Sequence, residues 1–271
     1  MRTTVLNNTG TGTDRFWFEC LSRAKTPALR LFCFPYAGGS AEIYRHWQKW
    51  FPPEIGICLV HLPGRGKRLA ETAFTRVSAL VNTIADRMGP HIHTPYALYG
   101  HSMGALVSFE LSWELIRRYD AGPQHLFVSG HSAPQWPRSR PPTFHLPDDD
   151  FLMVLKRLNG TPREVLENPD LMAVFLEVLR ADFEMVETYQ YQRKGHLDCP
   201  ITVYSGLSDE DISLQACQGW PDQTLSGCKI KMFNGDHFFI RDPKSQFPDV
   251  FRNDVLSSVP CLAWQMNIGK T

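Results

Sequence analysis

Residues 95–105 read Pro-Tyr-Ala-Leu-Tyr-Gly-His-Ser-Met-Gly-Ala, and this stretch decides the fold class. An apolar run of strand length comes before Gly100, and a helical pattern follows Gly104. Glycines placed two residues before and two after a serine allow a sharp turn from strand to helix, which holds the hydroxyl above a sheet. Ser102 is therefore the candidate nucleophile. The alternative is a glycine-rich connection between a strand and a helix, without catalysis.

Further apolar runs of strand length lie on both sides of this stretch. They cover residues 28–35, 55–62, 125–129, 201–205 and 229–233. Helix-length stretches separate most of them. Strands that alternate with helices predict an α/β fold, with a mostly parallel sheet and helices on both of its faces.

One interval departs from this alternation. Two helical patterns, at residues 148–159 and 169–192, follow one another with no strand between them. We therefore expect a helical lid inserted at about residues 135–195 of a single domain that spans residues 15–271. A flexible arm, residues 1–14, is expected before it.

The composition excludes several classes of protein. Of 271 residues, 43% are hydrophobic and 21% charged, which predicts a packed globular core. Lys plus Arg (28) equals Asp plus Glu (28), so neither nucleic acid nor a membrane is an expected partner. No apolar run approaches the ~20 residues of a membrane helix, and the polar start predicts a soluble, cytoplasmic protein. Seven cysteines without a Cys-x-x-Cys pair predict buried free thiols, and neither disulfides nor zinc.

A serine nucleophile requires a histidine to take its proton and a carboxylate to orient that histidine. In the α/β-hydrolase arrangement the acid and then the histidine follow the serine, each after a strand. Asp209 follows the run at 201–205, and His237 follows the run at 229–233. We predict them as acid and base. Asp211 is the rival acid, and Asp236 is expected to be a turn residue.

Acyl transfer also needs hydrogen-bond donors for the oxyanion. One should be the backbone N–H of Met103, which follows the nucleophile at the start of a helix. The second should come from the loop Pro35–Ser40, where paired glycines expose backbone N–H groups; Tyr36 is our first choice and Ala37 the next. The alternative is a tight turn with no further role.

Taken together, the motifs resemble the type II thioesterases, the free-standing editing enzymes of nonribosomal peptide and polyketide synthases. The matching stretches are 34–40 (FPYAGGS), 62–68 (LPGRGKR), 100–105 (GHSMGA), 158–162 (LNGTP), 179–183 (LRADF) and 237–239 (HFF). Two positions depart from the family: Glu210 stands where a proline usually follows the acid, and Asp236 where a glycine usually precedes the histidine.

The resemblance implies a serine hydrolase with the triad Ser102, Asp209 and His237. It implies hydrolysis of acyl or aminoacyl thioesters on the phosphopantetheine arm of an acyl or peptidyl carrier protein. We expect a monomer that needs neither metal nor other cofactor. Arg65 and Arg68 are candidate contacts to the phosphate or to an acidic carrier; the alternative is that they brace the loop after the second strand.

Other functions remain open at this point. The same triad would serve a medium-chain fatty-acyl thioesterase or a general carboxylesterase. A hydrolase-like binding module without turnover belongs to a different class, and the complete Ser, Asp and His set argues against it.

Overall fold

A seven-stranded sheet in the order β1-β3-β2-β4-β5-β6-β7 forms the centre of the computed structural model, which describes residues 17–22, 24–138, 140–160, 168–242 and 244–259. The strands are β1 (Phe18–Cys20), β2 (Leu29–Phe34), β3 (Ile55–Val60), β4 (Tyr96–His101), β5 (Leu126–Ser129), β6 (Ile201–Gly206) and β7 (Cys228–Phe233). β1 is antiparallel to β3, and all the other neighbours are parallel. The predicted α/β class and mostly parallel sheet are confirmed. The expected arm, residues 1–14, lies outside the described residues.

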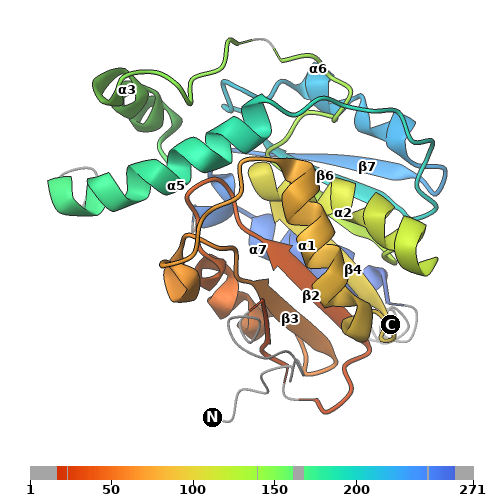
Figure 1. Ribbon diagram of the computed structural model, residues 1–271. Helices are drawn as coiled ribbons and strands as arrows, with labels where there is room; N and C mark the ends of the chain where they lie inside the picture. Colours follow the sequence, from red (N-terminus) through yellow and green to blue (C-terminus); the bar gives the residue numbers. More distant parts are fainter. Residues whose placement is uncertain (1–16, 23, 139, 161–167, 243, 260–271) are drawn as a thin grey trace.

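Helices cover both faces of this sheet (Figure 1). The α-helices are α1 (Val77–Met88), α2 (Met103–Tyr119), α3 (Asp148–Leu158), α5 (Pro169–Glu187), α6 (Leu214–Cys217) and α7 (Phe247–Ser257). The 3₁₀ helices are η2 (Ala41–Trp50), η3 (Gly66–Arg68), η4 (Gly89–His91), η5 (Trp220–Gln223) and η6 (Phe239–Arg241). One apolar core lies between the sheet and helices α1 and α2. A second core, rich in aromatic rings, lies between the opposite face and helices η2 and α7.

Strands β2 to β6 are mostly apolar on both sides because both of their faces are covered, whereas β7 at the border is only partly buried. Every residue of β3, β4, β5 and β6 is buried. Continuous apolar runs are typical of such strands, since neither face meets water. The carboxyl ends of β4, β6 and β7 lie at one edge of the sheet, where loops after parallel strands build binding sites.

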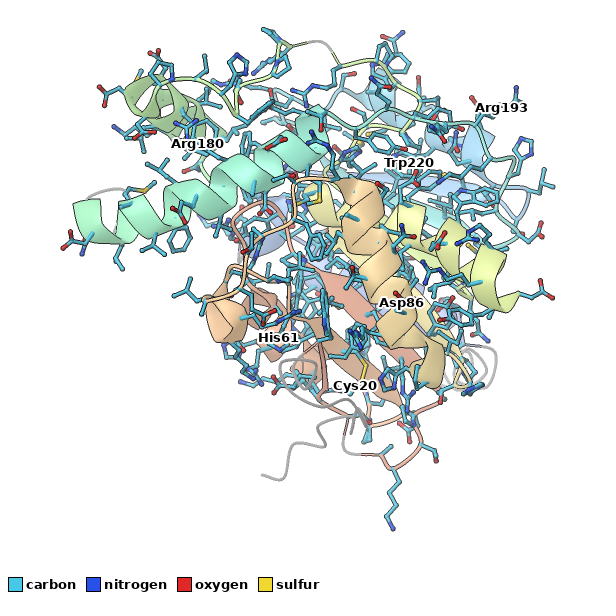
Figure 2. The ribbon with its side chains drawn as sticks, in the orientation of Figure 1. Cys20, His61, Asp86, Arg180, Arg193 and Trp220 are labelled. Atoms are coloured by element: carbon cyan, nitrogen blue, oxygen red, sulfur yellow. A yellow bond between two sulfur atoms is a disulfide. The ribbon has the colours of Figure 1, made fainter. Side chains whose placement is uncertain are left out.

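Helices α3 and α5 lie over that edge, in the interval between β5 and β6 where a lid is expected (Figure 1). They pack on each other through Phe151, Leu155, Met172 and Leu179. Arg180 of α5 lies over the ring of Phe151 at 4.6 Å and pairs with Asp148 at the start of α3 (Figure 2).

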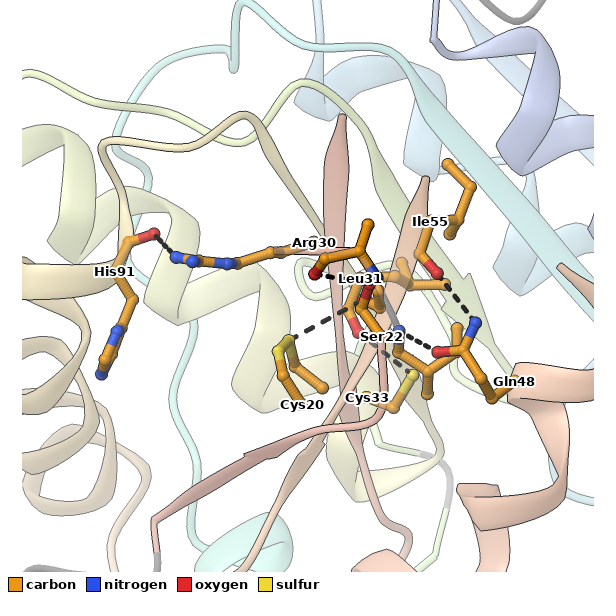
Figure 3. The surroundings of a disulfide bond; sticks show 12 residues. Cys20, Ser22, Arg30, Leu31, Cys33, Gln48, Ile55 and His91 are labelled. Atoms are coloured by element: carbon orange, nitrogen blue, oxygen red, sulfur yellow. Dashed lines mark hydrogen bonds between the residues drawn. A yellow bond between two sulfur atoms is a disulfide. The ribbon is translucent and has the colours of Figure 1, made fainter. Parts of the chain in front are cut away.

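The cysteines correct one expectation. Cys20 and Cys58 face each other in the antiparallel register of β1 and β3, with their Cα atoms 4.0 Å apart, and form a disulfide (Figure 3). The prediction of free thiols is therefore wrong for this pair. A strand of three residues is too short to recognise in the sequence, so the pairing could not be foreseen. Cys33, Cys199, Cys217 and Cys228 are free, and Cys261 lies outside the described residues.

Candidate active site

Ser102 occupies a strained turn between β4 and α2. Its φ of 54° and ψ of −118° lie in a region that residues with a side chain rarely adopt. No side chain fits at the two flanking glycines. A Cβ on Gly100 would lie 2.0 Å from the Gly104 carbonyl oxygen, and one on Gly104 would lie 2.2 Å from the Phe34 carbonyl oxygen. The Ser102 N–H donates to the Ser129 carbonyl at 2.7 Å. β4, β5 and α2 thus fix the position of the serine.

Asp209 and His237 form a hydrogen-bonded pair across the loops that follow β6 and β7. The His237 Nδ1 lies 2.7 Å from Asp209 Oδ2. The other oxygen, Oδ1, accepts the N–H groups of Asp211 and Ile212 at 3.0 and 3.1 Å. Because an ionised carboxylate only accepts hydrogen bonds, this pairing puts the imidazole proton on Nδ1 and leaves Nε2 as an acceptor.

The two neighbouring carboxylates, Asp211 and Asp236, contact other groups. Asp211 pairs with Arg140 at 2.6 Å and lies 3.6 Å from Arg157. Asp236 accepts the Phe238 N–H at 2.8 Å, which is typical of a turn residue. Of the candidate acids, Asp209 is the one that contacts the histidine.

Ser102 and His237 open onto one cavity of about 600 Å³, beneath the lid. Tyr36, Ala37 and Met103 line the same cavity. No described residue accepts a hydrogen bond from the backbone N–H groups of these three residues. The residues whose N–H groups are the expected oxyanion donors therefore line the same cavity as Ser102.

The remaining walls of the cavity are mainly apolar. They include Leu106, Ala133, Leu155, Leu158, Leu179, Phe183 and Val186, several of which belong to α3 and α5. The lid helices thus line the cavity in addition to packing on each other. Such a wall suits an apolar chain attached to the reacting carbonyl.

The structure places Arg65 and Arg68 inside the protein, with 7% and 5% of their surface exposed. Arg65 makes two hydrogen bonds to Asp182 of α5, at 2.5 and 2.8 Å. Arg68 binds Glu71 and the His61 carbonyl and lies 3.8 Å from the Trp17 ring centre. Because both guanidinium groups are committed internally, the structure favours the bracing alternative over a carrier or phosphate contact.

Asp182 is the residue that sequence reasoning missed. It is fully buried and joins α5 to the loops after β2 and β3 through Gly38 and Arg65. One signal was available: an acidic residue stands among the apolar residues of the predicted helix, between Leu179 and Phe183. A buried carboxylate requires hydrogen-bond partners.

His101, beside the nucleophile, is a buried neutral group. Its Nδ1 lies 2.9 Å from Ser129 Oγ, and its ring centre is 5.1 Å from that of His237. Burial lowers the pKa of His101 well below its usual value, and the nearby His237 acts in the same direction. His101 therefore stays uncharged at neutral pH and packs against the rings of His237, Phe238 and Phe239.

Among the described residues, one group could offer metal ligands: Glu19, Glu42 and His61. Side chains already neutralise this group, because Arg45 binds both glutamates and Lys67 lies 2.5 Å from Glu19. The cluster lies at the β1 edge of the sheet. Its donor set therefore forms a partly exposed ion-pair network.

The site combines Ser102 in a strand-to-helix turn with a hydrogen-bonded Asp209–His237 pair, beneath a helical lid on a mostly parallel sheet. This combination is typical of a hydrolase. The chain belongs to the thioesterase family: the model described as "Thioesterase domain" matches residues 29–253. This family membership confirms the resemblance seen in the sequence.

Relatives place the chain within the family. The gramicidin S biosynthesis protein GrsT of Aneurinibacillus migulanus is 41% identical over 228 residues, which are 84% of this chain and 89% of GrsT. The structure of BorB, a type II thioesterase from the borrelidin biosynthetic cluster, has a TM-score of 0.81 and 28% identity and covers 93% of this chain and 100% of BorB. The medium-chain S-acyl fatty acid synthase thioesterase of Rattus norvegicus is more distant, with 29% identity over 234 residues, covering 84% and 88% of the two chains.

None of the helices in the described part of the chain is long and apolar enough to cross a membrane.

Proposed function

We propose that this protein is an editing thioesterase of a nonribosomal peptide or polyketide synthase. In this role it hydrolyses acyl or aminoacyl thioesters from the phosphopantetheine arm of a carrier protein. The observation that carries the proposal is that His237, hydrogen-bonded to Asp209, lines the same cavity as Ser102. The identity to GrsT, higher than that to the medium-chain enzyme, supports the assembly-line role.

The proposed chemistry proceeds in two steps. Ser102 Oγ attacks the thioester carbonyl carbon, and His237 Nε2 takes the hydroxyl proton. The N–H groups of Met103 and Tyr36, or Ala37 in place of Tyr36, hold the oxyanion; losing one such donor typically costs ~3 kcal/mol in the transition state. The carbon–sulfur bond breaks, and the thiol leaves with the proton from His237.

The second step regenerates the enzyme. Water attacks the acyl-serine carbonyl while His237 takes a proton from it, and the ester bond to Ser102 breaks. The proton then returns to the serine oxygen, and the free acid leaves. Asp209 keeps the imidazole in the correct tautomer through both steps.

The proposal includes a partner and a location. The partner is an acyl or peptidyl carrier protein, and the enzyme acts as a monomer in the cytoplasm. Light scattering measures the molar mass of the purified chain, alone and with a loaded carrier, and so tests whether it is a monomer. Fractionation of the producing cells, with immunoblotting for this chain, tests the location.

Acyl release from loaded carrier proteins tests the function. We expect the wild-type chain to convert acyl-carrier to free carrier, as measured by intact mass, and Ser102→Ala to lose at least about 10³-fold in rate. A fluorophosphonate should label the wild type and leave the alanine variant unlabelled. Faster turnover of oxygen esters than of acyl-carrier would instead indicate a carboxylesterase. No labelling and no turnover would indicate a binding module.

A further inference from the structure

The buried carboxylate of Asp182 connects the lid helix α5 to the loop that carries the proposed oxyanion donors. Its Oδ2 accepts the backbone N–H of Gly38 at 2.8 Å and one Arg65 nitrogen at 2.5 Å. Its Oδ1 accepts a second Arg65 nitrogen at 2.8 Å. Asp182 has no exposed surface, so water does not compete for these contacts.

The bonded N–H belongs to the central peptide of a tight turn. The Gly39 N–H donates to the Tyr36 carbonyl at 2.9 Å and closes the turn. Gly38 has a φ of +73°, which suits the third position of a type II turn and favours glycine there. The Asp182 contact fixes the plane of the Ala37–Gly38 peptide inside this closed turn. Tyr36 and Ala37, which carry the proposed donors, are the first two residues of the same turn, so their positions depend on that plane.

Packing reinforces this contact. A Cβ on Gly38 would lie 2.5 Å from Leu179 Cδ2, and one on Gly64 would lie 3.3 Å from Val178 Cγ2. Arg65 also donates from Nε to the Pro63 carbonyl at 3.1 Å. One stretch of α5, residues 178–182, is therefore seated against the loops that follow β2 and β3.

We propose that Asp182 is a positioning residue for thioester hydrolysis, which sets the oxyanion turn at Tyr36–Gly39 from the lid helix through the Gly38 N–H. This inference rests on the proposed function. Arg65 supplies the charge that allows the carboxylate to be buried, since an unpaired buried charge is strongly disfavoured. The donor geometry thus depends on whether α5 is seated, although α5 supplies no donor to the oxyanion.

Two double variants separate positioning from stability. A single Asp182→Ala change would leave Arg65 buried without a counter-charge and risks unfolding. Asp182→Leu with Arg65→Met removes both charges and the acceptor for Gly38. Asp182→Asn with Arg65→Gln also removes both charges, but keeps a carbonyl oxygen that can accept the Gly38 N–H.

The readout compares transition-state and ground-state binding. With a trifluoromethyl ketone analogue of the substrate, Ser102 adds to the ketone carbonyl carbon and His237 takes the serine proton. The ketone oxygen becomes an oxyanion. The matching thioether analogue binds without forming one. Thermal unfolding of each variant is recorded in parallel.

For the Leu/Met variant we expect kcat/KM to fall about 30-fold and the ketone inhibition constant to rise by the same factor, because a displaced donor weakens binding of the oxyanion. Its thioether Kd should stay within about twofold. The Asn/Gln variant should retain kcat/KM within about fivefold of wild type, because the Gly38 contact is kept.

A matched control uses the same helix. Glu184 of α5 pairs with Arg76 at 2.5 Å and does not contact the oxyanion turn. Glu184→Gln should leave both the ketone inhibition constant and kcat/KM within about twofold.

Equal losses of kcat/KM in the two double variants would overturn the proposal. A Leu/Met variant that binds the thioether more weakly but keeps its affinity for the ketone would also overturn it. Failure of the wild-type chain to release any acyl group would instead reject the proposed function, whatever the variants do.

Discussion

At the scale of single residues, Asp209 and Asp211 stand two positions apart and have different partners. Asp209 contacts His237 and two backbone N–H groups, and its side chain is 1% exposed. Asp211 instead faces Arg140 and Arg157. From the sequence, Asp209 could be preferred as the acid, but Asp211 could not be excluded, because two residues of loop allow either carboxylate to reach the imidazole.

Substituting the two acids separately tests this assignment. Asp209→Asn should lower kcat for thioester hydrolysis by about 10³- to 10⁴-fold, because the amide favours the wrong imidazole tautomer. Asp211→Asn, the matched control, should stay within about fivefold, since it loses an ion pair outside the triad. Steady-state rates on an acyl-pantetheine measure both. A larger loss in the Asp211 variant would exchange the two roles.

The partners of a buried polar residue were the hardest feature to predict at this scale. The motif containing Ser102 and the loop position of His237 could be recognised because the chemistry demands a local pattern. The Asp182–Arg65 pair joins residues 117 positions apart, and no local rule connects them. For the same reason Arg65 could be read as a phosphate contact until its partner was known.

At the scale of elements, burial explains which parts could be predicted. Strands β2 to β7 were found within two residues of their ends. For β2 to β6 the reason is that both of their faces are covered, whereas β7 is only partly buried. The predicted helices at 148–159 and 169–192 correspond to α3 and α5, and α5 ends at Glu187. β1 has three residues and was not found, because its place depends on pairing with β3.

The start of α5 offers a prediction at this scale. Asn168 is its N-cap: the side chain accepts the N–H groups of Asp170 and Leu171, each at 3.1 Å. Asn168→Ala should lower the stability of the helix by about 1 kcal/mol, because two N–H groups lose their acceptor. Hydrogen exchange should speed up in the first turn of α5 and stay unchanged in α1. Equal exchange in wild type and variant would contradict the cap.

At the scale of the whole molecule, five histidines are held neutral by burial. Burial lowers the pKa of His125 and His131 to about 4, and it also lowers the pKa of His61, His91 and His101. When the chain unfolds, these groups regain their ordinary pKa near 6.5. Between about pH 4 and 6.5 the unfolded state therefore binds more protons than the folded state.

The free energy of unfolding should consequently be highest above about pH 6.5 and should fall as the pH decreases towards 4. Each additional proton that the unfolded state binds adds about 1.4 kcal/mol per pH unit to the slope of the free energy of unfolding against pH. Urea unfolding at a series of pH values measures it. His125→Gln, which keeps a donor for Thr202 Oγ1, should reduce the uptake by about one proton near pH 5. An unchanged slope would show that His125 does not titrate on unfolding.

The outer strand β7 limits how the molecule can associate. Its backbone forms one side of the sheet, and its sequence Cys228–Phe233 carries lysines at 229 and 231. If a second copy added its own β7 antiparallel to this one, centred on Ile230, Lys229 of each copy would oppose Lys231 of the other. Lys231 pairs with Asp254 of its own copy, so the charge of Lys229 is the one that disfavours such pairing; lysines are a common protection of exposed strand borders. Growth of the sheet from molecule to molecule is thereby resisted at the border farthest from β1.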